Sequence, residues 1–193
     1  MFPWPAFLSY IFITAFTPGP NTIASMSNGS KVGLKKTMPF ILGVFLAQCV
    51  IMSLCAIFTS ALFKLIPIIK LPMLIIGASY ILWLAWKIAH SSGEIQSDDS
   101  ASATVQAGAL LQFVNPKLYL YTITSLSGFV LPYYTSLPVV LGFCLILTFT
   151  ALLSCASWAA FGSLFRHLFS NHTRVVNYTM AALLVYSAIA LFL

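Results

Sequence analysis

The stretch "TPGPN", Thr17–Asn21, interrupts an apolar run that extends from Trp4 to Met26. Each proline removes a backbone donor and clashes with the preceding helical turn, and the glycine between them loosens the backbone. The stretch therefore predicts a break inside what is otherwise a helix. What such a break is for depends on the medium that surrounds the helix.

The composition identifies that medium. Of the 193 residues, 60% are hydrophobic and only 6% are charged, whereas about a quarter of the residues in a soluble domain are charged. A water-facing surface would have almost no charged residues, so the chain is predicted to be an all-α membrane protein that is surrounded by the lipid bilayer. It is predicted to form a single transmembrane domain over residues 1–193. The net charge of +6 does not indicate nucleic-acid binding, because the Lys and Arg residues lie at the ends of apolar runs and form no basic cluster.

Leader, disulfide and metal signals are not found in the sequence. No Lys or Arg precedes Lys31, so the first apolar run lacks the basic region of a signal peptide and is expected to be retained. The four cysteines lie within apolar runs without CxxC spacing, which is typical of small packing residues. No metal ligand, cofactor or catalytic residue is predicted.

Uncharged intervals long enough to cross a bilayer predict the spans, since a helix needs about 20 apolar residues to cross about 30 Å of hydrocarbon. Six such intervals predict six transmembrane helices. The interval from Lys117 to Arg166 is too long for one helix, and the turn "LPYYTSLP", Leu131–Pro138, divides it. The spans are predicted at Trp4–Met26, between Lys36 and Lys64, at Pro67–Ile88, from Ala107 to that turn, from the turn toward Arg166, and at Val175–Leu193.

The basic residues orient these spans. The loops between spans one and two, three and four, and five and six carry most of them, whereas the opposite face has only Lys64 and Lys70. Lys and Arg are retained in the cytoplasm, so those three loops are predicted to be cytoplasmic and both termini periplasmic, in a bacterial inner membrane. The polar segment His90–Gln106 holds all three acidic residues and is predicted to be a solvated cytoplasmic linker, residues 90–106.

Two halves of three spans each share landmarks. Pro18 and Pro116 interrupt the first span of each half and lie 98 positions apart, and Gly43 and Gly142 near the start of each second span lie 99 positions apart. Because three is an odd number, the second half must enter the membrane from the opposite face. We therefore predict two inverted three-helix repeats, an arrangement common in secondary transporters. The repeats are residues 1–89 and 107–193.

The two interrupted helices indicate where a site lies. In hydrocarbon every backbone N–H and C=O needs a partner, so an unwound stretch at membrane depth survives only where protein or a polar cavity satisfies it. Both breaks fall near the middle of their spans, and paired breaks of this kind mark the substrate sites of many transporters. The predicted substrate-binding or gating residues are Thr17, Pro18, Gly19, Pro20, Asn21, Gln112, Asn115, Pro116 and Lys117.

Several of these residues also have simpler interpretations. A proline in a membrane helix often only kinks it for packing, and Lys117 lies at the membrane interface if the fourth span begins later. Hydrogen bonds between helices explain Gln112 and Gln48 as well as substrate contact does. The hydroxyl-rich segment "YTITSLS", Tyr121–Ser127, is a candidate to line a path, but its Ser and Thr side chains are expected to bond back onto their own helix.

Beyond these patterns, the motifs resemble those of a known family. "TPGPN" and "QFVNPK" (Gln112–Lys117) resemble the two signature segments of the LysE/RhtB amino-acid exporters. "SYILWLAWKIA" (Ser79–Ala89), "LSGFVLP" (Leu126–Pro132) and "LLVYSAI" (Leu183–Ile189) are similar to the cysteine/O-acetylserine exporter branch of that family. The similarity covers nearly the whole chain, with the motifs in the expected order.

The resemblance implies a six-span secondary exporter of small metabolites in the inner membrane, and it leaves a homodimer open. One departure is that many relatives carry paired glycines after the first motif and in the second span. Here Gly33 is followed by Thr37 and Gly43 by Ala47, so close helix contact is less expected at these positions.

The predicted spans contain no Asp or Glu. A dibasic substrate such as lysine would need a buried counter-charge, so a neutral zwitterion of the cysteine or O-acetylserine type is favoured. The half-helix N-termini and Lys117 are expected to attract its carboxylate. Lys117 is predicted to bind the substrate or to act as a gate. An exporter of another amino acid such as threonine or homoserine, or a membrane assembly partner that transports nothing, stays open. An intramembrane enzyme would need a nucleophile and a base at depth, and because no span contains His, Asp or Glu, no enzymatic activity is predicted.

Overall fold

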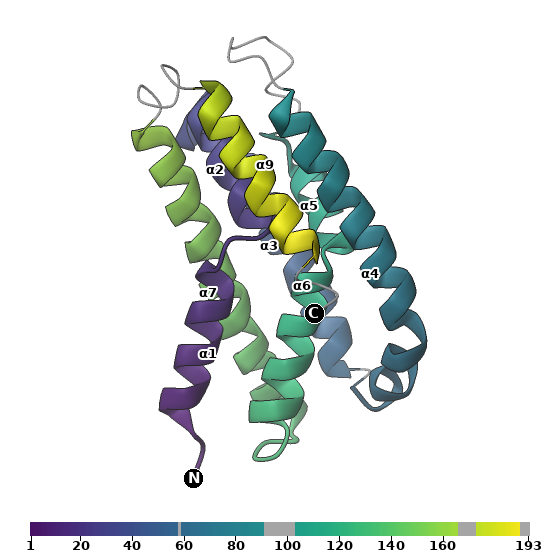
Figure 1. The fold of residues 1–193 in the computed structure, drawn as a ribbon. Coiled ribbons are helices and arrows are strands. Elements are labelled where there is room, and N and C mark those ends of the chain that lie inside the picture. The colour runs from purple at the N-terminus through teal and green to yellow at the C-terminus, as the bar shows by residue number, and fades with distance from the viewer. Residues whose placement is uncertain (58, 91–102, 166–172, 190–193) are drawn as a thin grey trace.

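The computed structural model describes residues 1–57, 59–90, 103–165 and 173–189. Within these ranges every regular element is a helix, so the all-α prediction is confirmed for the described chain (Figure 1). In chain order the helices are α1 (Trp4–Phe16), α2 (Pro20–Val32), α3 (Leu34–Ile57), α4 (Thr59–Ala89), α5 (Val105–Val114), α6 (Pro116–Ile123), the π-helical segment η2 (Thr124–Val130), α7 (Leu137–Leu164) and α9 (Thr173–Ile189).

Two of the described helices, α3 and α7, are by themselves long and apolar enough to cross a membrane. The outer face of α3 carries Leu42, Leu46, Val50 and Leu54, each about half exposed and spaced one helical turn apart. Such a stripe of large exposed aliphatic side chains would be unfavourable in water and is the surface expected of a helix that faces lipid.

The first helix break lies where "TPGPN" predicts it. Helix α1 ends at Phe16, the backbone is extended at Gly19, and α2 begins at Pro20. The predicted end of the first span at Met26 is wrong, because α2 continues to Val32. Its last two turns are polar in sequence, yet Ser27, Asn28 and Gly29 are buried in a helix that packs mainly against α7. The helix ends only before Gly33, whose φ of 84° favours glycine.

The second break lies at Asn115, which ends α5 and also begins α6. The predicted linker was too long at its end, because Val105 and Gln106 already belong to α5. The side chain of Thr104 explains this start, since its Oγ1 accepts a hydrogen bond from the Ala107 amide at 3.2 Å and so caps the helix. Residues 91–102 of that linker lie outside the described residues.

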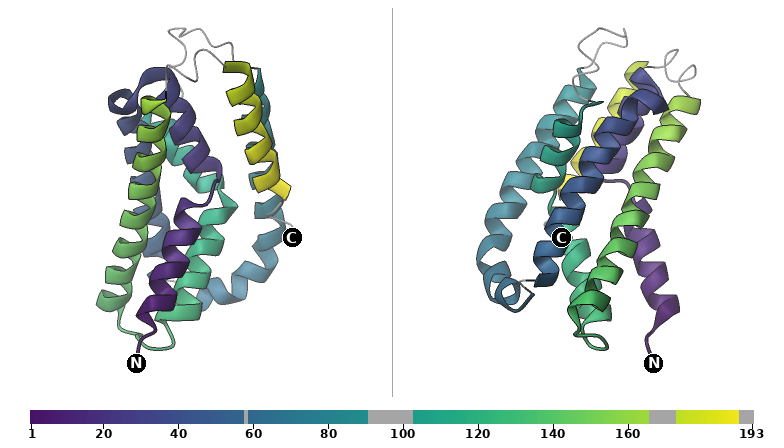
Figure 2. Two further views of the ribbon diagram at one scale, coloured as in Figure 1. Left: turned by 60° about the vertical axis from the view of Figure 1, so that its left-hand side comes forward. Right: turned by 180° about the vertical axis from the view of Figure 1, so that it is seen from behind.

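Helices α4 and α9 pack along each other and form a pair beside the body made by the other helices (Figure 2). The predicted boundary of the third span was wrong, because α4 begins at Thr59 and not near Pro67. Lys64 therefore belongs to this helix and not to the loop before it, whereas Lys70 lies within the helix as predicted. The predicted last span is described from Thr173 to Ile189, and residues 190–193 lie outside the described residues.

Glycines let the helices of the body approach closely. A Cβ atom built at Gly29 or Gly162 would lie 2.2 or 2.1 Å from a carbonyl oxygen across the α2–α7 contact, and one at Gly43 or Gly108 would lie 2.0 Å from a carbonyl across the α3–α5 contact. Gly43 thus makes the close helix contact that its sequence context made less expected. Gly142 has nothing within 4 Å of such an atom, so these two landmarks of the proposed repeat do not share an environment.

Both breaks lie at about half the height of the molecule, where α1 passes into α2 and α5 into α6 (Figure 1). Gly77 of α4 supports the second break from outside, because a Cβ there would lie 2.4 Å from Cδ of Pro116. The packing of α2, α3, α5 and α7 therefore brings two chain interruptions, far apart in sequence, to the centre of the fold.

Candidate functional site

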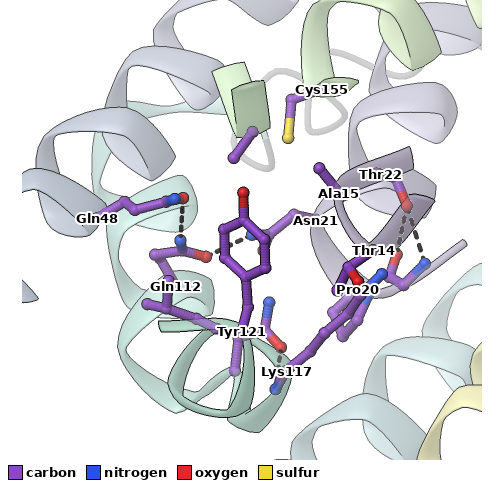
Figure 3. Close-up of a pocket in the computed structure, with 14 residues that line it drawn as sticks. Thr14, Ala15, Pro20, Asn21, Thr22, Gln48, Gln112, Lys117, Tyr121 and Cys155 are labelled. Atoms are coloured by element: carbon purple, nitrogen blue, oxygen red, sulfur yellow. Dashed lines mark hydrogen bonds between the residues drawn. The ribbon is translucent and has the colours of Figure 1, made fainter. Parts of the chain in front are cut away.

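A cavity of about 50 Å³ lies between the two breaks. One water molecule needs about 10–15 Å³ by this measure, so the cavity has room for a few water molecules or a small solute. It is formed by α1, α2, α3, α5, α6 and α7, with side chains from both halves of the chain (Figure 3). The lining residues are Thr14, Ala15, Gly19, Pro20, Asn21, Thr22, Gln48, Gln112, Asn115, Lys117, Leu118, Tyr121, Ala151 and Cys155.

The broken end of α1 is held by side chains of other helices. A helix that stops leaves its last carbonyls without helical partners, which is costly away from water. Ser154 Oγ of α7 donates to the carbonyl of Ala15 at 2.8 Å, and Trp158 Nε1 of the same helix donates to the carbonyl of Phe16 at 3.3 Å. Ser187 Oγ of α9 reaches the carbonyl oxygen of Pro18 at 3.4 Å. The break is thus fastened to α7 and α9.

Lys117 joins the two breaks. Its Nζ donates a hydrogen bond to the carbonyl oxygen of Thr17 at 2.7 Å, across 100 positions of sequence. Its side chain also runs along Gly19, where a Cβ atom would lie 3.1 Å from Nζ. Lys117 lines the cavity between the two half-helices, and its ammonium lies at the C-terminal, negative end of α1. Lys117 is the second residue of α6 and so lies in the first turn of a half-helix, as the sequence suggested, and its ammonium additionally pairs with the Thr17 carbonyl.

The N-terminal ends beyond the breaks are capped by local side chains. At the first break the Gly19 amide donates to Thr22 Oγ1 at 2.9 Å, and at the second Asn115 Oδ1 accepts from the Lys117 amide at 3.1 Å. These caps take up some of the amide groups that were expected to face a carboxylate. The positive helix ends still point at the cavity, because Pro20, Asn115 and their neighbours line it.

A chain of three amide side chains crosses the cavity wall (Figure 3). Asn21 Nδ2 of α2 donates to Gln112 Oε1 of α5, and Gln112 Nε2 donates to Gln48 Oε1 of α3 at 2.7 Å. Both glutamines are only 1% exposed. Hydrogen bonding between helices is therefore confirmed for Gln48 and Gln112, and both side chains also line the cavity.

Six of the nine predicted site residues line the cavity, and three do not. Thr17 and Pro18 contribute their backbone carbonyls, to Lys117 and Ser187 respectively. Pro116 packs against Gly77. The six lining residues are Gly19, Pro20, Asn21, Gln112, Asn115 and Lys117.

Five polar lining residues were not among the predicted ones, and one of them, Thr22, caps the start of α2 by accepting from the Gly19 amide. Thr14 lies one turn before Pro18, and Gln48 is the one amide in a long apolar helix, so helical spacing and polarity were available signals. Tyr121 belongs to a segment where back-bonding was expected, and Thr122 and Ser127 do bond to the carbonyls four residues earlier. The list is completed by Cys155, for which no sequence signal existed because a buried thiol normally only packs.

The chemistry of the lining is amide, hydroxyl, thiol and one ammonium. The fourteen lining residues include no carboxylate and no histidine. In the described part of the chain, moreover, no group of three His, Cys, Asp or Glu side chains is placed to hold a metal ion. The arrangement can bind a polar solute through hydrogen bonds and can attract a carboxylate.

Known proteins are similar to this chain in sequence. The pattern of the LysE type translocator family matches residues 12–193. Proteins named cysteine/O-acetylserine efflux protein from Escherichia coli (strain K12), Shigella flexneri and Shigella sonnei (strain Ss046) are each 37% identical to the chain over 187 residues, which cover 97% of this chain and 96% of the relative. Among solved structures none matches the chain with significance. The chain therefore belongs to the LysE type translocator family of amino-acid exporters, and it is a multi-pass inner-membrane transporter and not an enzyme.

Proposed function

We propose that this transporter exports small neutral amino acids or their derivatives, of the cysteine and O-acetylserine type, from the cytoplasm. The observation that carries the proposal is the cavity between two broken helices, lined by amides, hydroxyls and Lys117 but by no carboxylate among the described residues. A dibasic solute would leave its second cation without a counter-charge in this cavity, whereas a zwitterion would not. The names of the relatives support the same substrate class.

The architecture we propose has six spans in two inverted three-helix repeats. The first repeat ends with α4 and the second begins with α5, and a cytoplasmic linker at 90–104 joins them. Each repeat then begins with a broken helix, and α4 and α9, the third helix of each, pack together. In such an arrangement the two repeats rock around a central site, which becomes accessible from one side at a time.

The distribution of basic residues supports an orientation with both termini in the periplasm. The ends of α2 and α4 and the starts of α3 and α9 lie at one end of the molecule (Figure 1), and Lys and Arg gather there. Among the described residues, the basic ones at this end are Lys31, Lys35, Lys36, Lys87 and Arg174.

The proposed assembly includes a homodimer, which cross-linking in membranes would test.

Transport by inside-out membrane vesicles tests the function directly. Vesicles that contain the protein would be given radiolabelled cysteine, O-acetylserine, threonine, homoserine or lysine, with and without an imposed pH gradient. We expect saturable uptake of cysteine and O-acetylserine. If uptake of every solute equals that of protein-free vesicles, the remaining alternative is a membrane assembly partner that transports nothing. Preferential uptake of threonine or homoserine would assign the protein one of these substrates instead. Saturable uptake of lysine alone would refute the preference for zwitterions.

A further inference from the structure

The three amides on the cavity wall leave two polar groups without a partner. Asn21 Oδ1 and Gln48 Nε2 are buried, and neither has a hydrogen-bond partner among the described residues. Both belong to residues that line the cavity, at opposite ends of the chain Asn21–Gln112–Gln48. A buried amide group that lacks a partner is unfavourable, so both ends are predisposed to bind a polar solute.

The chain of amides has a direction. Each carboxamide offers one oxygen that accepts and one NH₂ group that donates. Gln112, in the middle, accepts from Asn21 with its oxygen and must therefore turn its NH₂ group toward Gln48, which receives it with oxygen. Gln48 is then left with a donor and Asn21 with an acceptor. Reversing all three amides exchanges the two ends but always leaves one donor and one acceptor.

One donor and one acceptor on the same cavity match the two charged groups of an amino acid. A carboxylate accepts hydrogen bonds and an α-ammonium group only donates them. Lys117 uses one of its three donor hydrogens on the carbonyl of Thr17, whereas Gln48 Nε2 has no partner among the described residues and is therefore the donor that gains most from a carboxylate. A second cation on the solute would gain nothing from an NH₂ group.

We propose that Gln48 binds the substrate carboxylate through Nε2 and that Asn21 Oδ1 receives the substrate ammonium group. Gln112 is then a positioning residue, because its orientation decides which end of the chain donates. This inference rests on the proposed function and makes Gln48 the residue that selects zwitterions over dibasic amino acids.

The variant Gln48→Glu tests the donor at its own position. A glutamate keeps the length of the side chain and still accepts from Gln112 Nε2, but it replaces the NH₂ group by a charged oxygen. We expect the KM for cysteine uptake in inside-out vesicles to rise about tenfold or more, because a charge-assisted hydrogen bond is replaced by repulsion. We also expect uptake of lysine to appear, because the carboxylate provides the counter-charge.

The neutral variant Gln48→Met is a second test, needed if a buried glutamate at this position prevents folding. Gln48→Met has a similar volume and removes donor and acceptor together, so the KM for cysteine should again rise about tenfold, without any uptake of lysine. Equal lysine uptake by Gln48→Glu and Gln48→Met would overturn the charge-based selection.

Gln112→Glu tests the positioning role. A glutamate in the middle accepts on both sides, so Gln48 and Asn21 must both turn their NH₂ groups inward and both outer ends become oxygens. The KM for cysteine should then rise as in Gln48→Glu while the maximal rate changes much less, a split that a loss of folded protein would not produce. The matched control is Gln106→Glu, an exposed position on α5 that does not line the cavity, for which the wild-type KM is expected.

Uptake by the wild-type protein, measured in the same way, distinguishes a failure of the proposed function from a failure of the proposed role of Gln48. Wild-type uptake at the background level would overturn the proposed function and this inference with it. Clear wild-type uptake together with an unchanged KM for cysteine in both Gln48 variants would overturn the inference alone.

Discussion

Lys117 satisfies a backbone carbonyl that the first helix break would otherwise leave without a partner. With Ser154, Trp158 and Ser187 it belongs to a set of side chains, from three helices, that hold the end of α1. The loss of such a donor would cost about 0.5–1.5 kcal/mol, and more where the carbonyl is then left away from water. The residues around the break therefore have a structural task as well as a place in the transport site.

The variant Lys117→Met is expected to abolish export. It removes the cation from the cavity and the donor from the exposed Thr17 carbonyl, so we also expect a loss of stability of only about 0.5–1.5 kcal/mol. Vesicle uptake and thermal unfolding in detergent would measure the two effects, with Lys117→Arg as the variant that keeps the charge. If export and its pH dependence are unchanged in Lys117→Met, this residue has no part in the mechanism.

Helix contact in this protein depends on glycines whose neighbours are backbone atoms. At Gly43 the nearest group to a built Cβ is a carbonyl of α5, which cannot move aside as a flexible side chain would. In hydrocarbon, close approach of this kind replaces the hydrophobic driving force that joins helices in water. The α3–α5 and α2–α7 contacts therefore position the two breaks against each other.

Gly43→Ala and Gly142→Ala form a matched pair of variants. Gly43→Ala should destabilise the protein by about 1–3 kcal/mol, because the added methyl group meets the backbone of α5 at 2.0 Å. Gly142→Ala meets nothing within 4 Å and should be neutral or stabilise helix α7 by up to about 1 kcal/mol. Thermal unfolding of both variants in detergent is the measurement, and equal midpoints would contradict the close contact.

The whole molecule encloses the cavity between two packed zones. On one side lie the glycine contacts of α2 with α7 and of α3 with α5. On the other side α1 meets η2 and the start of α7 through aromatic rings, such as Phe7, whose ring centroid lies 5.8 Å from that of Phe129 and 5.5 Å from that of Phe143. A transporter that alternates between two sides must loosen one of these zones at a time.

The proposed orientation predicts where a reporter at the C-terminus will fold. With six spans and cytoplasmic basic loops, alkaline phosphatase fused after Leu193 should be active, because its disulfides form only in the oxidising periplasm. Green fluorescent protein fused at the same place should stay dark, since it does not fold after export by the general secretory route. A fluorescent fusion without phosphatase activity would reverse the orientation or change the number of spans.

Much of the fold could be predicted from the sequence, because the length of an apolar segment and the effect of proline on a helix depend only on nearby residues. The scarcity of charge required a membrane, and "TPGPN" and Asn115-Pro116 broke helices where proline and glycine must break them. The predicted helix ends were less accurate. Helix α2 continues past Met26 because its polar turns are buried against α7, and α4 includes Lys64 and packs along α9. Neither contact can be read from local hydropathy.

The sequence by itself determined an all-helical chain with two interrupted helices and polar groups beside each interruption. Only the tertiary structure decided that Lys117 binds the Thr17 carbonyl and that Gln48, Gln112 and Asn21 form one directed chain of amides. Composition and helix breaking depend on neighbours along the chain. Hydrogen-bond partners 64, 91 and 100 positions apart are chosen by the packing of whole helices, which no local pattern encodes.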